Sequence, residues 1–207
     1  MTKNKKHILT SDNFYEIETK KTQIVIGSTF STKMNHIKGW KTRLNGKYKK
    51  TAHYTIDING RVYEHFDPKY YSSFISVDSI DRNIISIVLE NQGWLLKDLR
   101  SDGFIDMVGN IYNSKVFEKK WRNFNYWASY NNKQFLSLIG LIKDISNRFE
   151  IPLNIVSHNT KIDIGINNFS GILYRSNFTN LATDPNPSLR FDDLKEGIEF
   201  LKIIENE

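Results

Sequence analysis

Apolar residues along this chain form two runs of strand length and two patterns of helical spacing. Residues 23–27 (QIVIG) and 84–90 (IISIVLE) are too short for helices, and each run is directly followed by polar residues. Helical spacing begins at Asn131, must end before Pro152, and returns from about Asp192 towards the C-terminus. Buried strands that stop in small polar residues are typical of α/β sheets, which present sites at strand ends. The pattern therefore predicts an α/β fold with a central sheet flanked by helices.

The segments between these runs carry weaker signals. Residues 52–58 and 61–66, separated by Asn59-Gly60, predict a β-hairpin. Residues 33–40 predict a short helix or turn that ends at Gly39, and residues 154–157 predict a short strand leading into His158. Residues 41–50, 70–82 and 159–186 are interpreted as loops, and residues 91–127 as an elaborated connection with a small hairpin.

We find no internal repeat and no linker, so one domain over residues 23–207, preceded by an N-terminal arm or edge element over residues 1–22, is the simplest organisation. A length of 207 residues, 39% hydrophobic and 13% aromatic, fits one sizeable core. No segment reaches the roughly 18 to 20 apolar residues of a membrane-spanning helix. The basic N-terminus has no apolar run behind it, so we expect no secretory signal and synthesis in the cytoplasm.

Composition limits the chemistry. The chain has no cysteine, so any metal must be held by histidine and carboxylate. The net charge of +6, from 29 basic and 23 acidic residues, could attract nucleic acid or an acidic wall polymer. Because the excess is spread widely along the chain, ordinary solubility is the better interpretation, and nucleic acid is not the expected partner.

Several polar residues stand at predicted strand ends, and each has a structural alternative. His158 follows a predicted strand, where it could reach a crevice or hydrogen-bond to its own loop. Glu90 ends an apolar run, so it could enter a pocket with a raised pKa or reach solvent. Asp184 could coordinate a metal or serve the Asp-Pro-Asn-Pro turn. His36 and His65 have polar neighbours and are predicted to lie at the surface.

The order of five segments goes further than any one of them. Residues 24–26 (IVI), 52–60 (AHYTIDING), 86–90 (SIVLE), 155–158 (IVSH) and 183–187 (TDPNP) follow one another with suitable gaps. This order resembles the type 2 N-acetylmuramoyl-L-alanine amidases, the superfamily of phage lysozymes and peptidoglycan recognition proteins. The resemblance covers about residues 20–200, and it marks the chain as a divergent member. It implies the fold of that family, a single α/β domain with a central mixed sheet flanked by helices.

The resemblance implies roles for individual residues. In that family two histidines and a carboxylate or thiolate hold a zinc ion, which polarises the scissile amide and activates water. Matched here, His158 and Asp184 are metal ligands and Glu90 is the catalytic base. Residues of the groove that would contact peptidoglycan or a muropeptide are His53, Tyr54, Asn91 and Trp94.

The chain departs from the family pattern at three positions. Gly27 stands where the first-strand histidine belongs, Ala182 replaces the oxyanion lysine, and Ala52 replaces the tyrosine of phage lysozymes. Loss of one oxyanion donor alone costs about a hundredfold or more in rate. The resemblance therefore implies an incomplete zinc site, weak or no hydrolysis, and action at the cell wall or in a phage virion. The alternatives are an active zinc amidase with a further ligand, and a structural protein of a phage particle.

Overall fold

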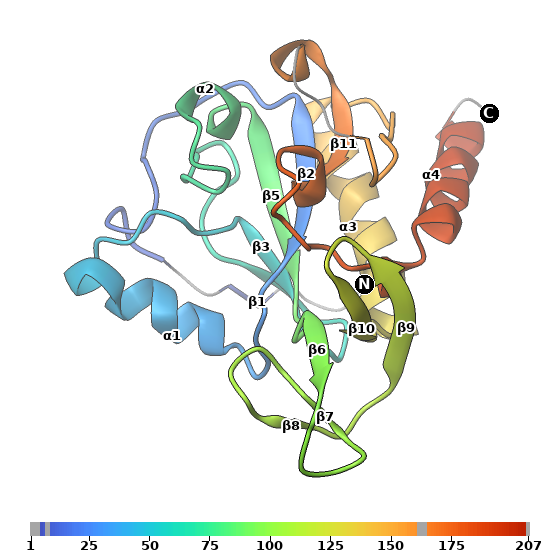
Figure 1. The fold of residues 1–207 in the computed structure, drawn as a ribbon. Coiled ribbons are helices and arrows are strands. Elements are labelled where there is room, and N and C mark those ends of the chain that lie inside the picture. The colour runs from blue at the N-terminus through green and yellow to red at the C-terminus, as the bar shows by residue number, and fades with distance from the viewer. Residues whose placement is uncertain (1–4, 7–8, 161–164, 206–207) are drawn as a thin grey trace.

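A mixed six-stranded β-sheet forms the centre of the molecule (Figure 1). The computed structural model describes residues 5–6, 9–160 and 165–205. The strand order is β1-β4-β3-β5-β2-β11, in which β2, β3, β5 and β11 are parallel and β4 runs antiparallel to β3. The expected α/β fold with a central mixed sheet is confirmed. The strands are β1 (Lys5–Lys6), β2 (Gln23–Ser28), β3 (Tyr54–Ile56), β4 (Val62–Glu64), β5 (Ile84–Leu89) and β11 (Gly171–Tyr174).

The two apolar runs of the sequence are the inner strands β2 and β5. Every residue of both strands is buried, and they pair in parallel register from Gln23↔Ile84 to Ser28↔Leu89. A strand with both faces covered needs apolar side chains on both, which explains the continuous rather than alternating pattern. β1 lies at the edge of the sheet beside β4, and the division of the chain at residue 22 stays a prediction.

Helices cover both faces of the sheet (Figure 1). α3 (Asn132–Phe149) and α4 (Phe191–Glu205) pack on one face, while α1 (Asn35–Thr42) and the N-terminal segment pack on the other. α3 begins where the apolar periodicity begins, because Asn131 caps it. The Asn131 side chain accepts from the N–H groups of Lys133 (2.9 Å) and Gln134 (3.1 Å), and the Gln134 side chain accepts from Asn131 N–H (3.3 Å).

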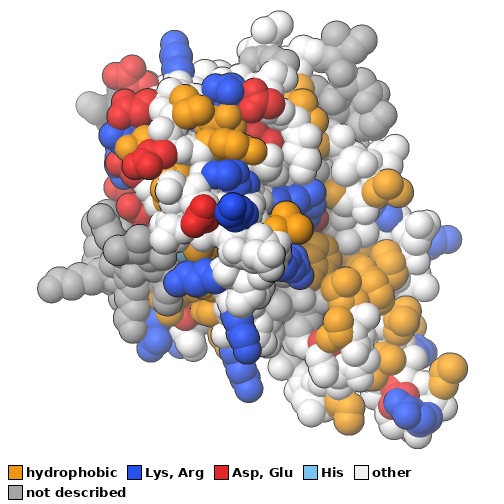
Figure 2. Space-filling model, turned by 90° about the vertical axis from the view of Figure 1, so that its left-hand side faces the viewer, with side chains coloured by type: hydrophobic (Ala, Val, Ile, Leu, Met, Phe, Trp, Pro, Cys, Tyr) orange, Lys and Arg blue, Asp and Glu red, His pale blue; other side chains and the backbone are white. Residues whose placement is uncertain are grey.

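Residues 91–127 form much more structure than a connection with one hairpin. They supply most of a second, antiparallel sheet in the order β8-β7-β6-β10-β9, which projects below the main sheet (Figure 1). Its core is small, with Leu95, Tyr112 and Ala128 buried together. Figure 2 shows hydrophobic side chains on the surface of this lobe at lower right. The strands are β6 (Trp94–Lys97), β7 (Phe104–Ile105), β8 (Ile111–Tyr112), β9 (Val116–Trp121) and β10 (Phe124–Ala128).

Three other segment predictions need correction. The loop expected over residues 159–186 contains β11, and the loop expected over residues 70–82 contains the short helix α2 (Asp78–Asp81). The strand expected over residues 154–157 is reduced to one bridge, Ile155↔Ile172. In each case a four-residue element is too short to show a periodic pattern. The 3-10 helices are η1 (Arg43–Gly46), η2 (Ile166–Asn168), η3 (Arg175–Asn177) and η4 (Pro187–Leu189).

The prediction that His36 and His65 lie at the surface is wrong. Their exposed fractions are 9% and 1%. Each ring places Nε2 at 2.9 Å from the Thr55 hydroxyl oxygen, so one threonine of β3 serves both histidines. A polar partner inside the core lowers the cost of burying an imidazole, and the local sequence does not reveal that partner.

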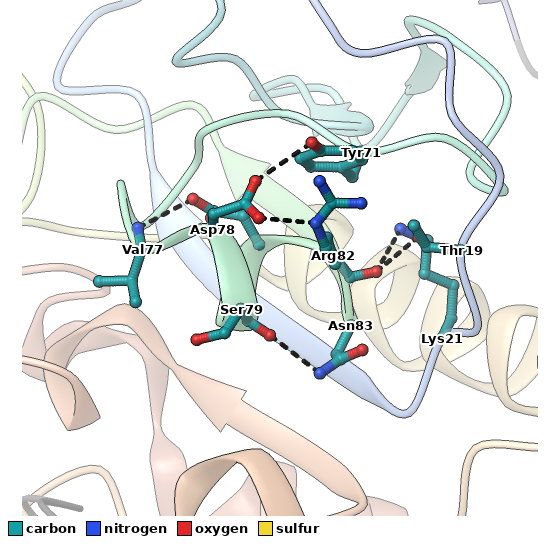
Figure 3. Close-up of polar contacts among 9 residues, drawn as sticks. Thr19, Lys21, Tyr71, Val77, Asp78, Ser79, Arg82 and Asn83 are labelled. Carbon is teal, nitrogen blue, oxygen red and sulfur yellow. Dashed lines mark hydrogen bonds and ion pairs between the residues drawn. The ribbon is translucent and has the colours of Figure 1, made fainter.

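Polar bonds close the edge of the sheet where the parallel strands begin (Figure 3). The Thr19 hydroxyl (2.6 Å) and the Lys21 ammonium (3.0 Å) both donate to the main-chain oxygen of Arg82. Asp78 accepts from the Tyr71 hydroxyl (3.1 Å) and from Arg82 Nε (2.7 Å). The candidate site residues Glu90 and Asp184 lie at the opposite end of the strands.

No helix in the part of the chain that the structure describes has the length and hydrophobicity of a membrane-spanning segment.

Candidate functional site

The carboxyl ends of four parallel strands meet at one edge of the sheet. β2 ends at Ser28, and Asp57, Glu90 and Arg175 directly follow β3, β5 and β11. Asp184 returns to the same edge from a later turn and accepts the N–H of Ser28 at 3.0 Å. Ligand sites of open α/β sheets form at such edges, so this is the candidate site.

Glu90 is a buried carboxylate held by main-chain groups. It is 2% exposed, and it accepts the N–H of Ile58 (3.2 Å) and the N–H of Met34. Burial raises the pKa of the Glu90 carboxyl above its ordinary value, although these two hydrogen bonds act in the opposite direction. The raised pKa suits a group that exchanges a proton, and the two N–H bonds also anchor the segments before α1 and after β3.

A cavity of about 300 Å³ opens beside Glu90. Asn91 lines it too, but its side chain is fully engaged: Nδ2 donates to Ala128 O (3.0 Å), and Oδ1 accepts from Gly93 N (2.7 Å) and Asn186 Nδ2 (2.9 Å). Asn91 therefore ties the main sheet to the small sheet and to the turn after Asp184. The remaining lining residues are Thr32, Ile58, Gln92, Tyr112, Ser114, Lys115, Ala128, Ser129, Tyr130, Asn131 and Gln134.

Asp184 is occupied by partners within the protein. It is 1% exposed, and besides Ser28 N–H it receives Arg175 Nη1 at 3.2 Å (Oδ1) and 3.3 Å (Oδ2). Burial raises the pKa of the Asp184 carboxyl, and the Arg175 guanidinium is the largest influence that opposes the rise. The peptide bond between Asp184 and Pro185 is cis.

His158 points into a different cavity. Its ring stacks on Phe191 of α4 at 3.8 Å between centroids, and it lines a space of about 130 Å³ with Tyr174 and Lys195. Burial lowers the pKa of His158 to about 4, so the imidazole is neutral at neutral pH. The main chains of His158 and Asp184 are nevertheless linked, because Ser176 Oγ donates to His158 O (3.2 Å) and Ser176 N donates to Asp184 O (3.1 Å).

Two of the residues predicted to contact substrate lie inside the core. His53 is 0% exposed, with its ring nitrogens at 2.8 Å from Ser86 Oγ and 3.0 Å from Tyr70 O. Tyr54 is 2% exposed and packs with the α3 side of the sheet. Neither side chain offers surface to a ligand in this conformation. Their assignment as substrate-binding residues has no support from their positions.

Trp94 is half-buried at the start of β6. Its ring stacks on Phe124 of β10, with centroids 4.5 Å apart and an interplanar angle of 10°. The pair belongs to the small sheet, and Trp94 does not line the cavity beside Glu90. Of the four predicted contact residues, the structure brings only Asn91 to that cavity.

A zinc ion, which the resemblance implies, finds no matching donor set among the described residues. Those residues contain no group of three or more histidine, aspartate or glutamate side chains that could hold a metal. Gly27 supplies no donor, both oxygens of Asp184 are engaged, and the His158 ring is stacked elsewhere. As arranged here, these side chains do not fit the ion.

Two arginines at the site were not predicted from the sequence. Arg175 pairs with Asp184, and Arg122 donates to the main-chain oxygens of Ser176 (2.9 Å), Thr179 (2.8 Å) and Ala182. Arg122 comes from the small sheet, so its reach to this loop depends on tertiary structure. No local pattern in the sequence indicated either arginine.

One sequence profile of a protein family matches this chain. The sequence profile described as "N-acetylmuramoyl-L-alanine amidase" matches residues 18–168, a range that includes Glu90 and His158 and ends before Asp184. A comparison with curated protein sequences finds no match.

Solved structures share the fold at low sequence identity. They include the N-acetylmuramoyl-L-alanine amidase LysC from Clostridium intestinale URNW (13% identity, TM-score 0.51, 95% of this chain and 99% of that chain). A mutant endolysin from Bacillus subtilis has 13% identity and a TM-score of 0.56 over 96% of this chain and 99% of that chain. The amidase AmiD from E. coli, solved with the substrate anhydro-N-acetylmuramic acid-L-Ala-D-gamma-Glu-L-Lys, has 16% identity and a TM-score of 0.55 over 88% and 59%.

The family match extends over well more than half of the 207 residues. The chain belongs to the N-acetylmuramoyl-L-alanine amidase family.

Proposed function

We propose that this protein binds peptidoglycan peptides where the parallel strands of the sheet have their carboxyl ends, and that it hydrolyses them weakly or not at all. Family membership supports the choice of ligand. The ion pair of Asp184 with Arg175 carries the second half of the proposal, because a metal ion at that carboxylate would have to displace the guanidinium. Gly27 and Ala182 add no ligand and no cation.

The cavity beside Glu90 is the proposed binding surface. It combines a buried carboxylate with side chains that reach solvent, among them Ser114 and Lys115. A wall peptide carries amides and carboxylates, which such a polar cavity can meet with hydrogen bonds and one positive charge. Glu90 would position an amide of the ligand, and in an active enzyme it would accept the proton of water.

The place of action proposed is the bacterial cell wall, in the context of a phage. An endolysin and other wall amidases are among the proteins that share the fold. The proposal differs from its two alternatives in measurable ways. A fully active zinc amidase would carry about one zinc per chain and cleave the lactyl–L-alanine amide, whereas a structural phage protein would do neither and would not bind purified wall.

A filled cavity tests the proposal directly. The Ser114→Trp variant places an indole in the cavity, and we expect it to weaken co-sedimentation with purified peptidoglycan by about tenfold or more, or 1.4 kcal/mol. Ser101→Trp is the matched control, since Ser101 is an exposed serine on the loop between β6 and β7. Muropeptide release, measured by mass spectrometry against an active amidase, should be slow or absent.

Two results would count against the proposal. Equal wall binding by the wild type and Ser114→Trp would remove the cavity as the binding surface. Release of free stem peptides at the rate of the active amidase, abolished by Glu90→Ala, would instead establish the active enzyme.

A further inference from the structure

Asp184 is a buried carboxylate whose positive partner belongs to the protein itself. It is 1% exposed, and its carboxylate oxygens accept from Ser28 N–H and Arg175 Nη1. A carboxylate taken out of water is stable only with a counter-charge and hydrogen bonds. Arg175 supplies the charge, and its side chain remains 29% exposed.

The side chains of Asp184, Phe74 and Arg175 pack around Gly27. A Cβ added at Gly27 would lie 2.9 Å from Asp184 Oδ2, 3.1 Å from Phe74 Cζ and 3.6 Å from Arg175 Cδ. The guanidinium in turn lies over the Phe74 ring, 5.7 Å from its centroid. The space in which residue 27 could present a ligand is therefore filled by the ion pair and an aromatic ring, and glycine is the residue that this packing accepts.

A second cation makes the surroundings unfavourable for a metal ion. Arg122 holds the chain around Asp184 through three main-chain oxygens, and its charge acts on Asp184. A divalent ion at Asp184 would have to displace Arg175, and the positive charge of Arg122 would also repel it.

We propose that Arg175 is the resident cation of this site, which takes the position at Asp184 that a metal would need and makes the folded Asp-Pro turn independent of metal. The inference rests on the proposed function in treating this edge as the family site, but it does not require wall binding. It predicts strong energetic coupling between the two side chains and indifference to zinc.

A double-mutant cycle measures the coupling. Arg175→Met leaves a buried carboxylate without its partner, and it should lower the melting temperature by roughly 6 to 20 °C. Asp184→Asn removes the charge with little change of shape. The double variant Arg175→Met/Asp184→Asn should melt at a clearly higher temperature than Arg175→Met alone, because it contains neither charge and so no buried carboxylate without a partner.

A surface ion pair provides the matched control. Arg148 Nη2 lies 3.6 Å from Asp67 Oδ1, and the two side chains are 48% and 42% exposed. Arg148→Met should change the melting temperature by no more than about 3 °C. If Arg175→Met gives no folded protein, Arg175→Lys replaces it in the same cycle, with a smaller loss and the same sign of coupling expected.

Metal content is the second measurement. Native mass spectrometry after incubation with excess zinc should show the metal-free mass, and chelation with EDTA should leave the melting temperature unchanged. Additive effects in the cycle would overturn the proposal. So would a one-zinc species that is lost in Asp184→Asn. Failure of wall binding alone would refute the proposed function and leave this inference standing.

Discussion

The two ends of the parallel sheet each bury a carboxylate near a basic side chain, yet they differ in what surrounds these groups. At the amino-terminal end, Asp81 is 1% exposed and accepts the N–H groups of Ile75 (2.7 Å) and Val77 (3.0 Å). The basic side chain there is Lys21, which is 4% exposed and on which the charge of Asp81 acts. At the carboxyl end, Asp184 is equally buried, but its partner Arg175 reaches solvent.

This difference shows that burial of a carboxylate does not by itself mark a functional site. Asp81 accepts two N–H groups of the loop before α2 and so holds that loop in place. The Lys21 ammonium donates to the main-chain oxygen of Arg82 (Figure 3), so this end is closed. The carboxyl end instead leaves a guanidinium and the cavity beside Glu90 open to a ligand. The two ends of the sheet therefore differ in whether the residues around the buried carboxylate reach solvent. In open α/β sheets such access is found at the carboxyl ends of the strands.

The largest effect expected at the closed end is that of Asp81→Ala. The variant leaves two buried N–H groups without acceptors and Lys21 without a nearby negative charge, which together should cost about 3 to 5 kcal/mol in the free energy of unfolding. Chemical denaturation measures the loss, and peptidoglycan binding by the folded fraction should be unchanged.

Asp78→Ala is the control for this prediction. Asp78 lies on the same short helix, but its carboxylate is 64% exposed in its ion pair with Arg82, so its loss should destabilise the protein far less than the loss of Asp81. If Asp81→Ala destabilised the protein no more than Asp78→Ala, or abolished wall binding in folded protein, the contrast between the two ends would be wrong.

A smaller effect at the closed end is the pH dependence that Lys21 introduces. Burial lowers the pKa of Lys21 from 10.5 to about 7, and the charge of Asp81 opposes that shift. Between these two values the unfolded chain binds more protons than the folded one, so the stability contributed by Lys21 rises with pH. The slope is at most about 1.4 kcal/mol per pH unit.

Comparison with Lys21→Met isolates this titration. The free energy of unfolding of the wild type, minus that of the variant, should increase from about pH 7 to about pH 9.5. Lys20→Met is the control, because Lys20 is exposed and adjacent in sequence. A difference that stays constant with pH would mean that Lys21 keeps an ordinary pKa in the folded protein.

The sequence predicted the closed core better than the open edge. β2, β5 and α3 could be predicted because burial on both faces, or on one helical face, leaves a periodic pattern. The order of segments also gave the family, and it placed Glu90 at the edge that carries the site. β11 escaped, because four residues within a segment rich in asparagine and serine carry no period.

The partners at the site could not be predicted in the same way. Arg175 meets Asp184, and Arg122 crosses from the small sheet, through contacts that no local pattern records. The burial of His36 and His65 depends likewise on Thr55 between them. Side-chain partners far apart in sequence are set by packing, so sequence reasoning gives the position of a charged group more readily than its counter-charge.

The smallest effect expected is that of Glu90→Gln at the open end. The amide keeps one acceptor oxygen, but its NH₂ group must face the N–H of either Met34 or Ile58, which should cost about 1 to 2 kcal/mol. The loss should be local, because these two bonds anchor the segments that border the cavity. Hydrogen exchange at Met34 and Ile58 should accelerate more than at the central residues of β5.

Glu150→Gln is the control for this prediction. Glu150 is an exposed glutamate just after α3, and the variant should change neither exchange nor stability. If exchange at Met34 and Ile58 stayed at the wild-type rate in Glu90→Gln, the carboxylate would not hold the rim of the cavity, and the open end would be as rigid as the closed one.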